Sequence, residues 1–149
     1  MKRTVVMGIG NLLLSDDGVG VHAVKALAER DLPDWVQVLD VGTAFLDALP
    51  ALETTQRVII IDALQADGVP GQIYTMPLEQ CAPREMTGLH DFDIFAMLAM
   101  ANNQHPVEVT VIGVEPEQIS WGLELSQQVA QALPAVLDTV CKTIGISSE

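Results

Sequence analysis

Basic side chains are scarce in this sequence. Its 149 residues include 7 Lys and Arg against 20 Asp and Glu, which gives a formal net charge of −13. Nucleic acids and anionic membrane surfaces are bound through clusters of basic residues, so this charge argues against both as partners. It favours a protein that meets a metal ion, another cation or a basic protein surface.

Cysteines and long apolar runs are also few. Cys81 and Cys141 are far apart and show no CxxC spacing, so the sequence indicates neither a disulfide framework nor a zinc knuckle. Two thiols in a reducing cytoplasm are the simplest interpretation. No apolar run approaches the roughly 20 residues that span a bilayer, and the N-terminus carries no signal-peptide pattern. We therefore expect a cytoplasmic protein that contacts no membrane.

The remaining composition is that of a folded globular chain. Hydrophobic residues make up 49% of the sequence and charged residues 18%, a balance that supports a packed core. We find no internal repeat, linker or low-complexity tail. The length predicts a single domain over residues 1–149, and a monomer is the default for an acidic domain of this size.

Short apolar runs alternate with segments of helical periodicity. The run at 58–61 is apolar on both faces, as a central parallel strand is, whereas 72–76 alternates weakly, as an antiparallel edge strand does. The pattern predicts an α/β fold: a three-layer, twisted, mostly parallel five-stranded sheet with helices on both faces. Strands are expected at 4–7, 36–39, 58–61, 72–76 and 107–114, and helices from about 15 to 30, 44 to 52, 94 to 101 and 123 to 144. Pro50 is expected to end or distort the second helix and Pro134 to kink or divide the last.

The stretch from Met7 to Gly20, MGIGNLLLSDDGVG, joins the first strand to the first helix. Its first two glycines allow a tight turn at the end of the strand. Ser15 or Asp16 is the expected N-cap of the helix, and acidic residues suit the positive end of the helix dipole. A dinucleotide-binding loop would need a third glycine near position 13, where this chain has Leu13, and the two aspartates would repel a phosphate.

Carboxylates follow each of the first three strands. In a parallel sheet, Asp16, Asp17, Asp40 and Asp62 would all stand at the carboxyl edge, where ligands bind near a reversal of strand order. A loop carrying His90 could fold over that edge. Two carboxylates and one imidazole, with positions left open for water or substrate, form a plausible site for a divalent transition metal.

Each of these residues also has a purely structural interpretation. Taken alone, Asp17 is explained by the helix dipole, His90 by a surface or helix-start position, and Asp40 by bonding of the turn at 42–43, while Asp62 is evenly balanced between loop capping and function. Only their shared location makes the joint case for a site.

Other catalytic arrangements are not recognisable. His22 and His105 are expected to be solvated, and Cys81 has no nearby partner histidine that would make it a nucleophile. The sequence contains no HExxH pattern and no recognisable serine or cysteine catalytic arrangement.

With these residues in view, the chain resembles the nickel–iron hydrogenase maturation endopeptidases over almost its whole length. The matching features are G-x-G-N-x-L-x-x-D-D-G-x-G at 8–20, the Asp40-Val41-Gly42-Thr43 turn, the Ile59-Ile60-Ile61-Asp62-Ala63 strand end, His90 before an apolar helix, and Ile112-Gly113-Val114-Glu115-Pro116-Glu117. The first motif is highly specific and the histidine segment is the least so.

This resemblance implies an α/β fold and a highly specific cytoplasmic peptidase. Such enzymes remove a C-terminal extension from the hydrogenase large-subunit precursor after nickel insertion. Carried onto this sequence, the metal-contacting and catalytic residues are Asp17, Asp62 and His90. The nickel is presented by the substrate and is weakly bound or absent in the resting enzyme; it could polarise the scissile carbonyl or activate a water.

Two alternatives remain open at this point. A non-enzymatic nickel chaperone docking on the precursor would use the same three residues and leave the substrate's mass unchanged. A general metallo-aminopeptidase would cut unrelated peptides.

Overall fold

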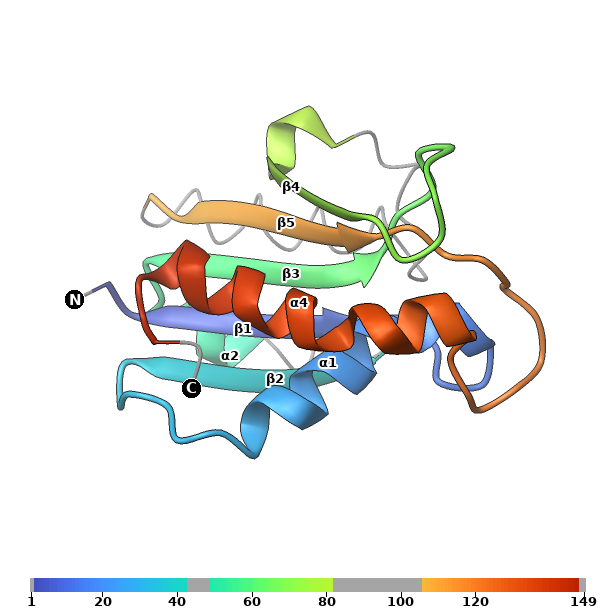
Figure 1. Cartoon of the computed structure of the whole chain (residues 1–149). Coiled ribbons are helices and arrows are strands. Elements are labelled where there is room, and N and C mark those ends of the chain that lie inside the picture. Colours follow the sequence, from blue (N-terminus) through green and yellow to red (C-terminus); the bar gives the residue numbers. More distant parts are fainter. Residues whose placement is uncertain (1, 43–48, 82–105, 148–149) are drawn as a thin grey trace.

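The computed structural model describes residues 2–42, 49–81 and 106–147 (Figure 1). In this part of the chain a five-stranded sheet has the order β2-β1-β3-β5-β4. Three of its pairings are parallel, and β4 runs antiparallel beside β5 at one edge. The predicted α/β architecture, including its antiparallel edge strand, is confirmed. The strands are β1 (Thr4–Ile9), β2 (Val36–Gly42), β3 (Arg57–Ala63), β4 (Ile73–Pro77) and β5 (Glu108–Val114).

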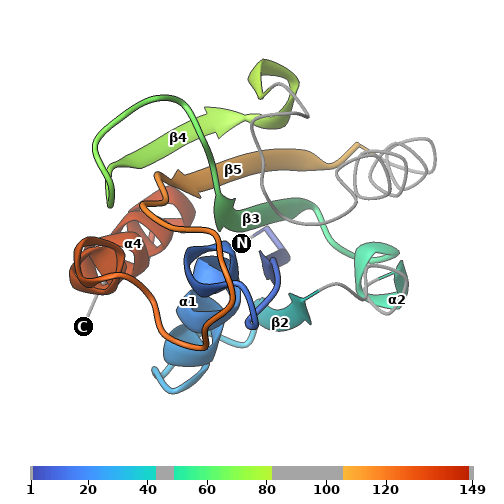
Figure 2. The same cartoon turned by 90° about the vertical axis from the view of Figure 1, so that its right-hand side faces the viewer.

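Helices cover both faces of the sheet. Figure 2 shows α1 (Val19–Ala28) and α4 (Gln127–Ile144) on one face and α2 (Leu49–Leu52) on the other. Short 3-10 turns, η1 (Ser15–Gly18) and η3 (Leu78–Gln80), follow β1 and β4. The helix predicted at 44–52 is described only from Leu49, and it continues past Pro50, so this proline does not end it.

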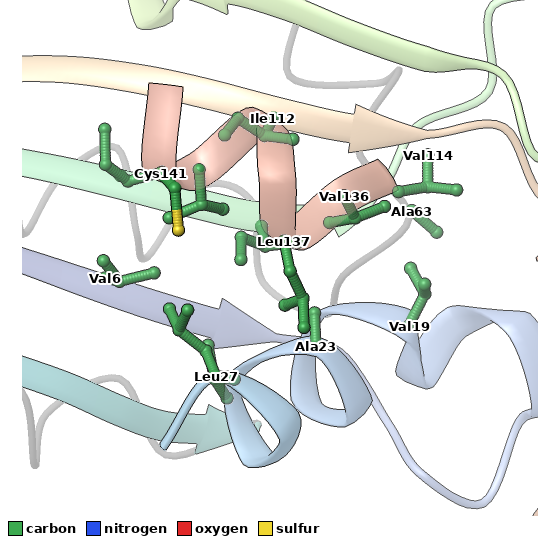
Figure 3. Close-up of a cluster of buried hydrophobic side chains, with 14 of the residues drawn as sticks. Val6, Val19, Ala23, Leu27, Ala63, Ile112, Val114, Val136, Leu137 and Cys141 are labelled. Carbon is green, nitrogen blue, oxygen red and sulfur yellow. The ribbon is translucent and has the colours of Figure 1, made fainter. Parts of the chain in front are cut away.

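The central strand β3 explains why two separate cores form. Its side chains alternate, with Val58 and Ile60 packing on the α2 face and Ile59 and Ile61 packing under α1 and α4. All four are fully buried, as the unbroken apolar run predicts. Figure 3 shows the second core, where side chains from the sheet meet those of the two long helices.

The last helix is shorter than predicted. It begins at Gln127 rather than near residue 123, because residues 115–126 form a loop with partners of its own. Pro134 lies inside α4 on its exposed side and does not divide the helix. The helix ends at Gly145, whose φ of +79° is left-handed, and the Ile146 N–H donates to the Cys141 carbonyl.

Two further predictions need correction or lie beyond the described chain. Neither Ser15 nor Asp16 caps α1; its N-cap is Gly18, and the two polar residues belong to η1. The surface loop expected at 77–89 is described only as far as Cys81 and contains η3, and the helix expected at 94–101 falls outside the described residues.

Candidate active site

The connection from β1 to α1 is packed more closely than most side chains would permit. A Cβ atom on Gly20 would lie 2.1 Å from the Ile61 carbonyl oxygen, and one on Gly10 would lie 2.0 Å from the Asp17 carbonyl oxygen. Gly10 also has a φ of +124°. The start of α1 is therefore seated directly on the carboxyl end of β3, and η1 lies against the turn that leaves β1.

Asp17 and Asp62 both lie beside this turn. The Asn11 N–H donates to Asp17 Oδ2 over 2.9 Å, and the Ala63 N–H donates to Asp62 Oδ1 over 2.8 Å. A Cβ on Gly10 would lie 3.6 Å from Asp62 Oδ1. Both carboxylates thus border the Gly10–Asn11 backbone, and both are fully buried.

The sheet topology explains why these two residues come together. β1 pairs with β2 on one side and β3 on the other, so the connections leaving β1 and β3 run in opposite directions. Asp17 follows β1, and Asp62 is the penultimate residue of β3. This is the topological switch point at which open α/β sheets place their ligand sites.

Of the other residues weighed for this edge, Asp40 does not join the pair. Asp40 lies within β2, opposite Gly8, and its side chain is exposed to solvent. His90 lies outside the described residues. Within residues 2–42, 49–81 and 106–147, no group of three His, Cys, Asp or Glu side chains is placed to hold a metal ion.

Asp16 has a role that sequence reasoning missed. Its Oδ2 accepts hydrogen bonds from the Glu117 N–H, the Gln118 N–H and the Ser126 hydroxyl, at 2.8–2.9 Å. Its Oδ1 accepts from the Ser126 N–H at 2.7 Å. This buried carboxylate therefore fastens the 115–126 loop to the turn that carries Asp17, and Figure 2 shows that loop crossing in front of α1.

Comparison with known proteins identifies the chain's relatives. A sequence model of the hydrogenase maturation protease family matches residues 21–143. The hydrogenase 2 maturation protease of Escherichia coli is 31% identical over an alignment that covers 93% of this chain and 88% of that protein. The chain belongs to the hydrogenase maturation protease family.

Solved structures agree with this assignment. The hydrogenase maturating endopeptidase HybD of Escherichia coli superposes with a TM-score of 0.85 at 29% identity, covering 96% of this chain and 92% of HybD. A hydrogenase 2 maturation peptidase from a Thaumarchaeota archaeon superposes with a TM-score of 0.76 at 35% identity, covering 98% and 100%. The protein is therefore a protease, and the switch point of its sheet is the place to look for catalytic groups.

A second buried carboxylate in this hydrogenase maturation protease was also missed. Glu115 Oε1 accepts hydrogen bonds from the Tyr74 hydroxyl at 2.6 Å, the Gly68 N–H at 2.8 Å and the Ala66 N–H at 3.0 Å. Burial raises the pKa of Glu115, but these three donors outweigh it and hold the pKa below the usual 4.5. Burial and the contact with Glu115 raise the pKa of Tyr74 to about 12. The signal that pointed to Asp62 is a carboxylate directly after an apolar strand. Glu115 carries the same signal and could have been found in the same way.

His22 is not the solvated residue that the sequence predicted. It is half-buried, and its Nε2 is inaccessible, with no hydrogen-bond partner in the described part of the protease. Burial and the Lys25 charge lower the pKa of His22 below 6.5, although a hydrogen bond with the Leu123 backbone opposes this. His105 lies outside the described residues.

Two further observations concern the cysteines and the helices. Neither Cys81 nor Cys141 forms a disulfide, and both are buried. None of the helices in the described residues is long and apolar enough to cross a membrane.

Proposed function

We propose that this protease is the endopeptidase that removes the C-terminal extension from a nickel–iron hydrogenase large-subunit precursor after nickel insertion. Membership of the hydrogenase maturation protease family and the likeness to the hydrogenase maturating endopeptidase HybD support the reaction class. The observation that carries the site is the meeting of Asp17 and Asp62 beside Gly10, at the switch point between β1 and β3.

The proposed site recognises the nickel ion that the substrate already holds. Asp17 and Asp62 offer carboxylate oxygens and His90 an imidazole nitrogen, a donor set that suits a borderline divalent ion. Only two of these three donors lie in the described residues, so the donor chemistry fits but the complete set stays a prediction. Because part of the nickel's coordination comes from the substrate, the resting enzyme binds the ion weakly or not at all.

Hydrolysis of a peptide bond requires a polarised carbonyl and an activated water. The divalent ion supplies one or both of these when it is bound. The Asn11 and Ala63 N–H groups fix one oxygen each of Asp17 and Asp62, which orients the remaining lone pairs before substrate arrives. Since both carboxylates are fully buried, an ion carried by a protein can reach them only when the atoms covering them are displaced.

Mass spectrometry of the large subunit tests this function. The protein is incubated with nickel-loaded and with nickel-free precursor, and the loss of the C-terminal extension is followed over time. We expect cleavage of the loaded precursor alone. Equal cleavage of both would contradict nickel recognition. Release of stoichiometric metal without a change in mass would indicate the chaperone instead, and cleavage of unrelated peptides a general peptidase.

Substitutions in the site provide the second test. Asp17→Asn, Asp62→Asn and His90→Ala should each lower the cleavage rate at least ~100-fold, because each removes a group that holds or orients charge in the transition state. The asparagine variants keep the side-chain shape and one acceptor oxygen, so an unchanged melting temperature separates lost chemistry from lost folding. A variant that retains the wild-type rate does not belong to the site.

A further inference from the structure

Large apolar side chains are exposed beside the proposed active site. In the described residues, Leu13 is 49% exposed, Trp121 81% and Leu123 68%, and Ile119 on the same loop is 38% exposed. We call Leu13, Trp121 and Leu123 the apolar patch. Contiguous exposed apolar surface on a soluble protein marks an interaction site more often than single exposed residues do.

Backbone pairing brings the two segments that carry these exposed side chains side by side. Leu14 and Gly122 form a parallel bridge, in which the Gly122 N–H donates to the Leu13 carbonyl at 2.9 Å and the Ser15 N–H donates to the Gly122 carbonyl at 2.8 Å. These hydrogen bonds set the backbone of Leu13 beside that of Trp121 and Gly122. Two segments more than a hundred residues apart in sequence therefore build one surface.

The segment that carries Trp121 is held by hydrogen bonds at both of its ends. The four hydrogen bonds to Asp16 fix both ends of the segment that carries Trp121, and the Ser15 hydroxyl donates to the Glu124 carbonyl at 2.8 Å. A preformed surface loses less conformational entropy on binding. Because Asp17 follows Asp16 directly, this surface lies next to the proposed catalytic carboxylates.

The acidic residues around the apolar patch indicate which kind of partner fits it. The exposed Glu117 and Glu124 flank the patch, and no Lys or Arg occurs in residues 4–24 or 109–141, the two segments that supply it. A second copy of this chain would bring an acidic rim against the same acidic rim, which like-charge repulsion disfavours. An apolar surface rimmed by Lys and Arg is complementary.

We propose that the apolar patch docks the folded body of the protein substrate, through an apolar pocket of that substrate with a basic rim. The proposal rests on the proposed function, because the partner is the protein from which the extension is removed. Trp121 is the anchor: a large exposed aromatic residue at the centre of an interface is the commonest kind of binding hot spot. Docking here holds the extension over Asp17 and Asp62 and explains how a protease can act on one protein.

Steady-state cleavage of nickel-loaded precursor tests the proposal. Trp121→Ser should raise KM about 30-fold and leave kcat unchanged, because the residue contributes to docking and not to chemistry. Leu123→Ser should also raise KM. Val69→Ser is the matched control, since Val69 is an equally apolar side chain, 70% exposed, outside the patch; its KM should equal that of the wild type. Unchanged KM in both patch variants overturns the proposal.

Two further measurements separate the possible failures. If the wild-type protein leaves the precursor uncut, the proposed function fails. Calorimetry of precursor binding then tests the docking surface by itself. Weaker binding by Trp121→Ser than by the wild type supports the docking surface, and equal binding overturns it. Sedimentation that shows a wild-type dimer and a Trp121→Ser monomer would assign the patch to a second copy of the chain and overturn docking of the substrate.

Discussion

At the scale of single residues, Asp16 accepts four hydrogen bonds from the 115–126 loop, whereas its neighbour Asp17 faces the Gly10–Asn11 turn and the end of β3. The two side chains are chemically identical and both are fully buried. Their surroundings distinguish Asp16, which fastens a loop, from Asp17, which borders the Gly10–Asn11 turn of the proposed site. The sequence alone shows only two consecutive aspartates at a helix start.

Removal of the Asp16 carboxylate should destabilise the protein strongly. Asp16→Ala leaves the three N–H donors and the Ser126 hydroxyl without their charged acceptor, so we expect the free energy of unfolding to fall by about 3 kcal/mol. Urea unfolding followed by circular dichroism measures this loss. Asp40→Ala removes an exposed aspartate and should change stability by less than ~0.5 kcal/mol. Equal stability of the two variants would show that the fourfold bonding contributes nothing.

The Tyr74–Glu115 contact gives this protein an isolated spectroscopic signal. Tyr74 is the only tyrosine in the chain, so phenolate absorbance reports on it alone. The folded protein should titrate with a pKa of about 12. Glu115→Gln should bring that pKa down toward 10, because the carboxylate that accepts from the hydroxyl is gone, while burial still raises it. A wild-type phenol that titrates near 10 would contradict the contact.

The pKa shifts of Glu115 and Tyr74 determine how the stability of the folded protein depends on pH. The pKa of Glu115 is held below 4.5, so its contribution to stability is present above the unfolded pKa and is lost as pH falls through the folded one. The pKa of Tyr74 is raised, which favours the neutral phenol in the folded state, so this contribution is lost as pH rises from about 10 toward 12.

At the scale of elements, the seating of η1 and α1 on the sheet depends on a glycine contact. Gly20→Ala would place a methyl group 2.1 Å from the Ile61 carbonyl oxygen and force the helix start away from β3. We expect a loss of about 3 kcal/mol in the free energy of unfolding, with cleavage impaired because Asp17 moves with the turn. Thermal and urea unfolding measure the first effect.

Gly145→Ala is the control for this substitution. Gly145 has a left-handed φ of +79° but nothing lies within 4 Å of an added Cβ, so the change costs only the conformational strain of about 1 kcal/mol. If the two alanine variants lost the same stability, close packing of α1 on the sheet would not be what Gly20 provides.

Elements with strong local patterns could be predicted from the sequence, and those fixed by distant partners could not. The apolar run 58–61 identified β3, and the weak alternation at 72–76 identified the antiparallel edge strand. The 115–126 loop was partly mistaken for helix because its conformation is set by Asp16, about a hundred residues away in sequence. No local periodicity carries that information.

In the candidate site too, local sequence patterns could be predicted and contacts with distant segments could not. Asp62 could be found because it directly follows the apolar run 58–61, and the structure places it beside the Asp17 turn. Glu115 also follows an apolar run, yet it entered the sequence analysis only as part of the 112–117 motif. The half-burial of His22 could not be predicted, because helical spacing does not reveal its hydrogen bond with the distant Leu123 backbone. The role of His90 stays a prediction.

At the scale of the whole molecule, the net charge of −13 should speed the encounter with a substrate that is basic around its docking pocket. We expect kcat/KM for the nickel-loaded precursor to fall roughly 10-fold between low and high ionic strength, because salt screens this attraction. The kcat at saturating substrate should stay constant. A kcat/KM that does not respond to salt would contradict a basic partner.

The central claim is that one rim of the sheet gathers Asp17, Asp62 and His90 around a single metal position. The most direct measurement is a crystal of the protein soaked in cadmium or nickel, with the ion located by its anomalous scattering. We predict an ion bound by both carboxylates and the His90 imidazole beside Gly10. An ion held elsewhere, or a His90 side chain on another face of the sheet, would contradict the account.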